Sequence, residues 1–231
     1  MCGRYTLRTP LEQWLESFSV DSFLEWTPRF NIAPSQSIVV IRNSINGKRE
    51  AVLLRWGLIP SWADDIHIGN RLINARAETL ADKPSFKHAL KLRRCLVLAD
   101  GFYEWKQTGK AKQPYFVEMA DQRLFAFAGL WDSWNRVQPP TESCTIITTK
   151  PNALLADIHD RMPAILEGGD AAKWLDPSTE PAAALTSLLV PYPDREMVAY
   201  PVGNQVNSPG HDAADCIRAL APRQDGTLFF D

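Results

Sequence analysis

The sequence lacks a paired-cysteine signature. Its four cysteines are widely scattered and form no CxxC motif or Cys/His cluster, so nothing predicts a zinc site. Cys95 and Cys144 lie inside apolar runs, and we expect both to be buried thiols of the core. Cys216 has no such context. Cys2 is therefore the cysteine whose position invites chemistry.

A long hydrophobic run is also missing. No stretch reaches 18 apolar residues, which excludes a transmembrane helix. Polar and charged residues occur within the first dozen positions, which is unlike a secretory signal peptide. We therefore expect a cytoplasmic protein with no membrane partner.

The third thing missing is an excess of basic charge. The formal net charge is −2, with 25 Lys and Arg against 27 Asp and Glu, whereas nucleic-acid-binding domains usually carry a basic footprint. Any contact with DNA would have to come from a local cluster of arginines.

What remains is the composition of a globular protein. The 231 residues, 45% of them hydrophobic, suit a single domain with a sizeable core. No internal repeat or linker divides the chain. We expect one domain over residues 1–207, followed by a polar C-terminal tail, 208–231, that packs loosely.

The predicted elements are mainly strands. Thr9 and Pro10 indicate the start of a helix, and the Asn46-Gly47 pair predicts a hairpin turn. Strands that run antiparallel, with helices between them, favour an α+β fold in which antiparallel and mixed sheets curl into a barrel-like core flanked by helices. The expected strands are 36–43, 49–57, 94–106, 113–120, 123–134, 144–150 and 196–203, and the expected helices are 9–18, 83–94, 168–177, 180–189 and one that begins near 152 and runs into a tight loop at Met162-Pro163.

The opening stretch "MCGRY" places Cys2 directly after the initiator methionine. Removal of Met1 would leave an α-amine and a thiol on one residue, with pKa values near ~7.7–8.0 and ~8.5. Two reactions fit this 1,2-aminothiol. The thiolate could attack an acyl carbon with the α-amine as base, or the amine could form an imine with an aldehyde, which the thiol would close to a thiazolidine.

Either reaction needs groups that move protons. Glu104 lies among aromatic residues in "ADGFYEWK", where desolvation would raise its pKa, although strand alternation could instead place it on the solvent face. His159 in "DIHDRMP" is a candidate proton carrier or a structural histidine near a helix end. Asn74 and Arg76 in "LINARAET" would share one face of an extended segment and suit an oxyanion or a phosphate.

Five segments in this order resemble one family: "MCGRY", "RFNIAPSQ", "WGLIPSW…LINARAET", "CLVLADGFYEWK" and "IHDRMP". Over residues 1–207 the sequence is similar to the SRAP family, the abasic-site-processing proteins first described as SOS-response-associated peptidases. The resemblance implies a covalent crosslink between Cys2 and the aldehyde of an abasic site in single-stranded DNA, as part of the DNA damage response. It also implies that Glu104 takes a proton from the amine, that His159 shuttles protons, and that Asn74 orients the N-terminus and the sugar.

The same resemblance suggests the DNA contacts. Arg4, Arg76 and Arg161 lie in the matched motifs and are candidate phosphate ligands, and Trp62 could stack on a base. Ala63 stands where some members have a second aromatic residue, so wedging at a junction should be weaker. The expected partner is single-stranded DNA with abasic sites, or a junction of single- and double-stranded DNA. We expect a monomer, associated with the nucleoid when bound, that needs no metal and no cofactor.

Three other functions stay open at this point. An N-terminal-nucleophile hydrolase or glutamine amidotransferase would use Cys2 on an acyl group, but it gives Glu104 and His159 no required role. An autoprocessing peptidase would only remove Met1. A plain single-stranded DNA-binding module would bind intact and abasic DNA alike.

Overall fold

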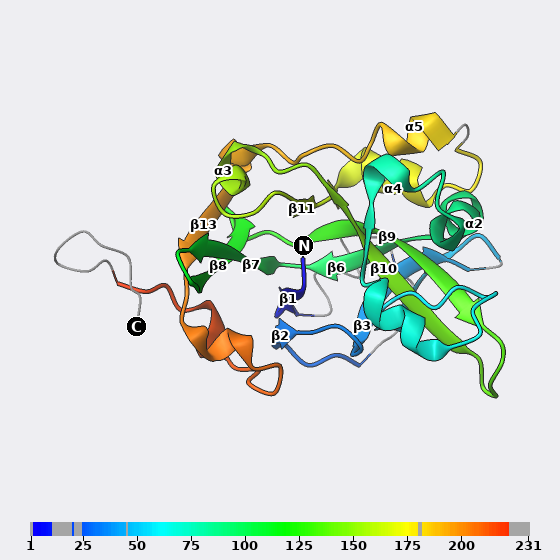
Figure 1. Ribbon diagram of the computed structural model, residues 1–231. Coiled ribbons are helices and arrows are strands. Elements are labelled where there is room, and N and C mark those ends of the chain that lie inside the picture. The colour runs from blue at the N-terminus through cyan, green and yellow to red at the C-terminus, as the bar shows by residue number, and fades with distance from the viewer. Residues whose placement is uncertain (1, 11–19, 21–24, 45, 180–181, 222–231) are drawn as a thin grey trace.

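The computed structural model describes residues 2–10, 20, 25–44, 46–179 and 182–221. Its centre is a closed barrel of five strands, in which β10 is parallel to β4 and every other pair is antiparallel (Figure 1). This confirms the α+β, barrel-like expectation. The barrel strands are β3 (Ser37–Asn43), β4 (Arg49–Trp56), β6 (Arg94–Ala99), β9 (Phe125–Trp134) and β10 (Thr141–Thr149).

A second, five-stranded sheet continues from the barrel in the order β13-β8-β7-β1-β2 (Figure 1). Its strands are antiparallel to their neighbours, and β1 lies inside the sheet between β2 and β7. The N-terminal strand is thus an interior element. The strands are β1 (Arg4–Leu7), β2 (Arg29–Ile32), β7 (Gly101–Thr108), β8 (Ala111–Met119) and β13 (Met197–Pro201).

The single strand predicted over residues 94–106 is wrong: it is two strands in different sheets, β6 and β7, separated at Asp100. The buried Asp100 carboxylate accepts hydrogen bonds from the hydroxyls of Thr6 (2.6 Å) and Thr9 (2.8 Å) and from the amide of Arg8 (2.6 Å). These bonds fix the end of β1 at the point where the chain leaves the barrel.

Three short strands extend the barrel where β10 ends and β9 begins. β5 (Asn74–Arg76) pairs parallel with β10, β11 (Met162–Pro163) pairs antiparallel with β10, and β12 (Ile165–Leu166) pairs with β9. The helix predicted from residue 152 is only α3 (Ala153–Ala156), capped by Asn152. The helix does not continue to residue 166, because the chain after it forms β11 and β12, which pair with β10 and β9.

The remaining helices are short and lie mostly on the barrel side in Figure 1. The buried Arg94 joins two of them, because its guanidinium donates to the Leu90 and Lys91 carbonyls at the end of α2 and to those of Trp174 (2.6 Å) and Asp176 (2.5 Å) at the end of α4. No helix in the described part of the chain is long and apolar enough to cross a membrane. The helices are α2 (Pro84–Leu92), α4 (Gly168–Leu175), α5 (Ala182–Thr186), and the 3-10 helices η1 (Ile66–Arg71), η2 (Ala77–Thr79), η3 (Asp194–Glu196), η4 (Asn204–Asn207) and η5 (Ala214–Ile217).

Several local predictions are confirmed. The Asn46-Gly47 turn joins β3 to β4, with Gly47 at a φ of +74°, a conformation that glycine adopts without strain. Cys95 and Cys144 are fully buried. The helix predicted over 9–18 lies largely outside the described residues, as do residues 180 and 181 of the helix predicted over 180–189.

The expectation of a loosely packed C-terminal tail is wrong for residues 208–221. The Asp212 carboxylate accepts from the backbone amides of Phe30 (2.6 Å) and Asn31 (2.9 Å) and pairs with Arg29. Asn31 in turn donates to the carbonyls of Ser208 and His211. Asp212 and the carbonyls of Ser208 and His211 thus tie this segment to β2, and its polar composition did not indicate these contacts.

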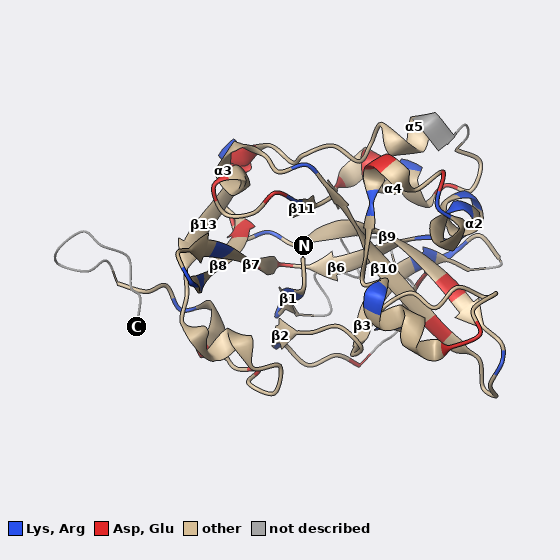
Figure 2. Ribbon diagram, viewed as in Figure 1, with Lys and Arg blue, Asp and Glu red and all other residues tan. Residues whose placement is uncertain are grey.

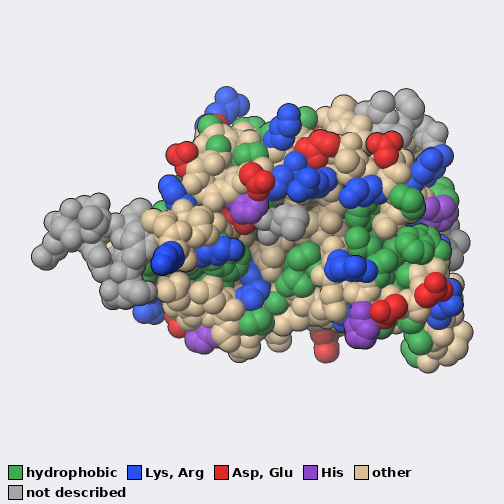
Figure 3. Space-filling model, in the orientation of Figure 1, with side chains coloured by type: hydrophobic (Ala, Val, Ile, Leu, Met, Phe, Trp, Pro, Cys, Tyr) green, Lys and Arg blue, Asp and Glu red, His purple; other side chains and the backbone are tan. Residues whose placement is uncertain are grey.

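Charge is spread over the whole fold. Figure 2 shows lysine, arginine, aspartate and glutamate residues distributed along both the barrel and the second sheet. The face seen in Figure 3 carries basic and acidic side chains close to one another, with an apolar area on its right-hand side.

Candidate active site

Cys2 is fully buried, two residues before β1. Its Sγ lies 3.9 Å from the carbonyl oxygen of Arg4. Burial raises the pKa of the Cys2 thiol well above its ordinary value, and the negative charge of Glu104 raises it further. The thiol is therefore uncharged at neutral pH, and Glu104 lies close enough to act on it electrostatically.

Asn74 binds the backbone of Cys2. Its Nδ2 donates to the Cys2 carbonyl oxygen at 2.9 Å. Residue 74 opens β5, which pairs with the barrel strand β10 at Ile146, so the barrel positions the amide. The Asn74 Oδ1 is buried and accepts no hydrogen bond from the described residues, which leaves one acceptor available in the site.

Glu104 lies on β7 and is 1% exposed, so the solvent-face alternative is wrong. Alternation fails here because both faces of this half of β7 are covered: Phe102, Tyr103 and Glu104 are all buried. Burial raises the pKa of the Glu104 carboxyl to about 7, against the opposing effect of the positive chain terminus. The group can therefore both bind and release a proton near neutral pH.

His159 faces Glu104 from the loop between α3 and β11. Its Nε2 lies 4.0 Å from Glu104 Oε2. Its Nδ1 lies 3.0 Å from the backbone nitrogen of Arg161 and 2.9 Å from Asp160 Oδ1. Desolvation lowers the pKa of the partly buried imidazole, so the ring is mostly neutral at pH 7.

The three predicted phosphate ligands differ in their surroundings. Arg4 donates to Asn31 Oδ1 (2.9 Å) and to the Val206 carbonyl (2.5 Å), so it also ties β1 to the C-terminal segment. Arg161 is buried and forms a two-bond pair with Glu78. Arg76 is exposed.

Trp62, in the loop before η1, is 54% exposed. It lines a surface hollow with Asp65, His67 and Arg71. Trp62 thus presents an exposed aromatic surface, whereas Trp56 is fully buried in the core.

Glu78 and Thr148, which both bind Arg161, were not predicted as site residues from the sequence. Glu78 stands two residues after Arg76, and Thr148 lies on β10, where its carbonyl accepts from Arg161 Nη2 at 2.5 Å. The motif "NARAET" marks the Glu78 neighbourhood, but its partner is 83 residues away. No local pattern could have identified the pair.

Within the described ranges one set of three possible metal ligands lies close together, His211, Asp215 and Cys216, on the C-terminal segment. His211 Nε2 and Asp215 Oδ1 are 2.7 Å apart. This set shares no residue with the site around Cys2.

Known proteins place the chain in a family. The family described as SOS response associated peptidase (SRAP) matches residues 1–209. The chain is 47% identical over 224 residues to abasic site processing protein YoqW of Bacillus subtilis (strain 168), covering 95% of this chain and 100% of that one. It is 33% identical to abasic site processing protein HMCES of Xenopus tropicalis, covering 85% and 67%.

A solved structure gives the same result. The crystal structure of a protein from Bacteroides thetaiotaomicron superposes with a TM-score of 0.86 at 28% identity, covering 95% of this chain and all of the other. The fold and the sequence therefore agree, and this chain belongs to the SRAP family.

Proposed function

We propose that the protein processes abasic sites by forming a covalent thiazolidine crosslink through Cys2, in single-stranded DNA. The observation that carries the proposal is the convergence on Cys2: Asn74 holds its carbonyl oxygen, and the charge of the buried Glu104 acts on its thiol. The relatives are named abasic site processing proteins, which supports the same substrate.

The reaction begins when Met1 is removed, by an aminopeptidase or by the site itself, which frees the α-amine of Cys2. The amine adds to the C1′ aldehyde of the ring-opened deoxyribose, and loss of one water gives an imine. The Cys2 sulfur then forms a bond to the same carbon, and its proton passes to the nitrogen. The net product is protein plus DNA minus one water.

Glu104 and His159 supply the proton transfers. A carboxyl whose pKa is about 7 accepts a proton from the ammonium form of Cys2 and returns one to the leaving water. The neutral His159, 4.0 Å from Glu104, relays protons during imine formation and reversal. The free Asn74 Oδ1 is an acceptor for a hydroxyl of the opened sugar.

DNA is held by a few local contacts. Arg76 offers an exposed guanidinium for a phosphate, and Trp62 offers a surface for stacking, which contributes about 1–3 kcal/mol per base. Arg4, on β1, and Arg161, whose amide contacts His159, are further candidate ligands for DNA phosphates. The covalent bond supplies permanence, so the non-covalent affinity is moderate and falls with salt.

The test is to mix the purified protein with a single-stranded oligonucleotide that carries one abasic site, followed by a denaturing gel and intact mass analysis. We expect a heat-stable adduct that lacks Met1 and has the mass of protein plus DNA minus one water. Cys2→Ala should form no such adduct, and an otherwise identical intact oligonucleotide should give none with either protein.

A matched Cys2→Ser variant distinguishes the carbon–nitrogen bond of the imine from the carbon–sulfur bond that closes the thiazolidine. It keeps the α-amine, so borohydride should trap an imine, while no heat-stable adduct survives without reduction. No adduct from a wild-type protein with a free Cys2 would refute the proposal, and release of ammonia from glutamine would then support acyl chemistry.

A further inference from the structure

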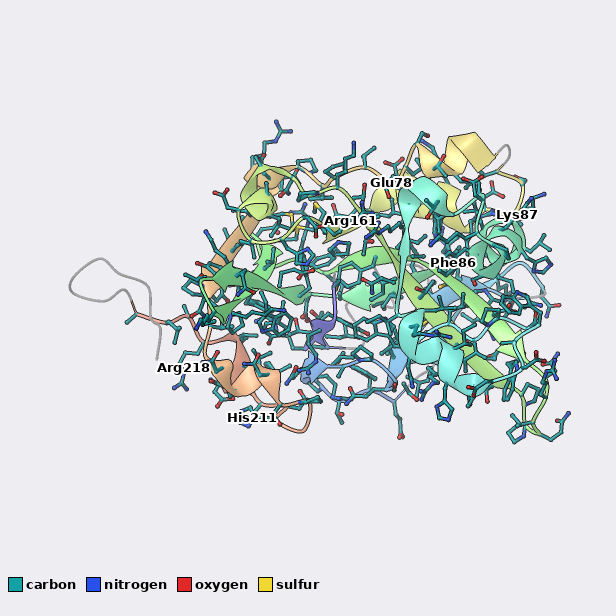
Figure 4. The ribbon with its side chains drawn as sticks, viewed as in Figure 1. Glu78, Phe86, Lys87, Arg161, His211 and Arg218 are labelled. Atoms are coloured by element: carbon teal, nitrogen blue, oxygen red, sulfur yellow. The ribbon has the colours of Figure 1, made fainter. Side chains whose placement is uncertain are left out.

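Arg161 joins three segments of the candidate active site. Its Nη1 and Nη2 donate to the two carboxylate oxygens of Glu78 at 2.7 and 2.9 Å, and Nη2 also donates to the Thr148 carbonyl at 2.5 Å. Figure 4 shows Arg161 and Glu78 next to each other above the barrel. The guanidinium therefore reaches across the end of β10 to the segment that follows β5.

The backbone of the same residue contacts His159. The Arg161 amide donates to His159 Nδ1 at 3.0 Å. A nitrogen that accepts a hydrogen bond carries no proton, so the neutral ring holds its proton on Nε2. That nitrogen is the one that faces Glu104 at 4.0 Å.

A second group favours the opposite tautomer. Asp160 Oδ1 lies 2.9 Å from the same Nδ1, and a carboxylate there would accept a proton from Nδ1 if the ring carried one. The Arg161 amide and the Asp160 carboxylate thus compete for one nitrogen. Whichever holds it decides whether Nε2 presents a proton or a lone pair to Glu104.

We propose that Glu78 is a positioning residue for His159: its bonds to Arg161 hold the Arg161 amide on Nδ1 and so keep the ring proton on Nε2. The inference rests on the proposed function, because it assigns the tautomer that the proton relay uses. β11 alone gives weak anchorage, since it pairs only Thr148 with Pro163 and Thr149 with Met162. The side chain of Asp160, the group that competes for Nδ1, is 82% exposed.

The charges around His159 set the background for this choice. Glu104 faces Nε2 and Asp160 faces Nδ1, and the positive charges of the chain terminus and of Lys112 both lower the pKa of the ring. Glu78 acts on the ring only through Arg161, whose hydrogen bonds are the main cause of the lowered pKa of Glu78. Glu78 is therefore ionised across the neutral range.

The first measurement is the tautomer in the DNA-free protein, read from the 15N shifts of the His159 ring, with His159→Gln used for assignment. The wild type should show the Nε2–H form. Glu78→Gln removes the charge and one of the two acceptor bonds, and we expect signals that move toward the Nδ1–H form. Glu78→Asp keeps the charge and should lie between the two.

The second measurement is the rate of adduct formation at saturating abasic DNA. We expect Glu78→Gln to lower it roughly tenfold, as for other residues that orient a functional histidine, with the half-saturating DNA concentration little changed. The matched control is Glu50→Gln on β4, which removes the charge of one carboxylate partner of Arg42 on β3 (2.7 Å). This control should keep both the wild-type tautomer and the wild-type rate.

The outcomes separate the two proposals. An unchanged tautomer in Glu78→Gln overturns the positioning role, whatever the rate does, and so does a shifted tautomer with an unchanged rate. A lower half-saturating DNA concentration with an unchanged rate would mean that Glu78 only competes with phosphate for Arg161. If the wild type forms no adduct, the crosslinking function fails while the ring shifts still decide the effect of Glu78 on His159.

Discussion

Asn74 Nδ2 donates to the carbonyl oxygen of Cys2 at 2.9 Å. One partner comes from the start of the chain and the other from β5, which pairs with the barrel strand β10. The bond therefore fixes the backbone of Cys2 against a rigid element.

Replacing Asn74 with alanine removes this bond. A hydrogen bond contributes about 0.5–1.5 kcal/mol net, so the rate of adduct formation should fall roughly two- to tenfold. Single-turnover gels with excess protein measure the rate. Asn46→Ala, in the exposed β3–β4 turn, is the control and should react as the wild type does; an equal loss in both variants would contradict the role of Asn74.

Burial of Glu104 makes stability depend on pH. The carboxyl binds its proton more tightly when folded, with its pKa raised from 4.5 to about 7, so the folded state holds more protons between these values. The free energy of unfolding of the wild type therefore falls as pH rises from about 4.5 to 7. Above pH 7 this loss of stability is complete, because the buried carboxyl is then ionised in the folded state.

Glu104→Gln has no such titration. Relative to the wild type it should gain stability between pH 5 and pH 8, by up to about 3 kcal/mol at 1.4 kcal/mol per pKa unit, in urea unfolding at both values. It should also form the adduct more slowly at pH 8, because no carboxylate accepts the proton. A stability difference that stays constant with pH would show that Glu104 does not titrate in this range.

Trp62 is the exposed aromatic of the predicted DNA surface. Trp62→Ala should weaken binding to intact single-stranded DNA by about 1–3 kcal/mol, measured by fluorescence anisotropy at fixed salt. Leu92→Ala removes another exposed apolar side chain, 70% exposed on α2, and should leave binding unchanged. Equal affinity for Trp62→Ala and the wild type would remove Trp62 from the interface.

Arg94 holds the ends of α2 and α4 together through four carbonyl oxygens. Arg94→Met leaves these acceptors without their donor and should cost at least about 3 kcal/mol, which corresponds to a melting temperature lower by roughly 6–12 °C at this chain length. The control Arg136→Met breaks an exposed pair with Asp64, whose contribution is about 0–1 kcal/mol. Similar losses in both variants would contradict the bridging role.

Gly57 and Gly69 lie back to back at the base of the Trp62 loop. A Cβ on Gly57 would meet the Gly69 carbonyl oxygen at 2.6 Å, and Gly57 has a φ of +128°. Gly57→Ala should therefore lower the melting temperature and weaken DNA binding through the displaced loop. Gly47→Ala, which meets no atom within 4 Å although its φ is also positive, controls for backbone strain alone. The double variant Gly57→Ala/Gly69→Ala should lose less than the sum, since one displacement relieves both contacts.

Local patterns predicted the parts of the fold that local physics decides. The Asn46-Gly47 hairpin follows from turn preferences, and the helix α2 begins with Pro84 in its first turn, where proline is favoured. The division at Asp100 does not, because a carboxylate inside an apolar run breaks the strand only through partners on β1. The burial of Glu104 could not be decided either, since alternation assumes one solvated face and β7 has none in its first half.

The candidate site also has a part that motifs in the sequence predict and a part that depends on long-range contacts. The positions of Cys2, Asn74, Glu104 and His159 were marked by motifs, and the structure brings them together. What the arginines do could not be read from the sequence, because the pairing of Arg161 with Glu78 and of Arg4 with the Val206 carbonyl joins segments far apart in the chain. Long-range ion pairs leave no periodic signal.

The interior position of β1 has a practical consequence for anyone who produces this protein. Cys2 is buried two residues before a strand that has neighbours on both sides, so an affinity tag or fusion partner attached ahead of it would pass through the candidate active site. In the proposed mechanism it would also block the α-amine of Cys2. Tags, fluorophores and surface tethers belong at the C-terminal end of the chain. By the same reasoning, a genetic fusion that places another domain upstream should silence the crosslinking chemistry while leaving the barrel intact.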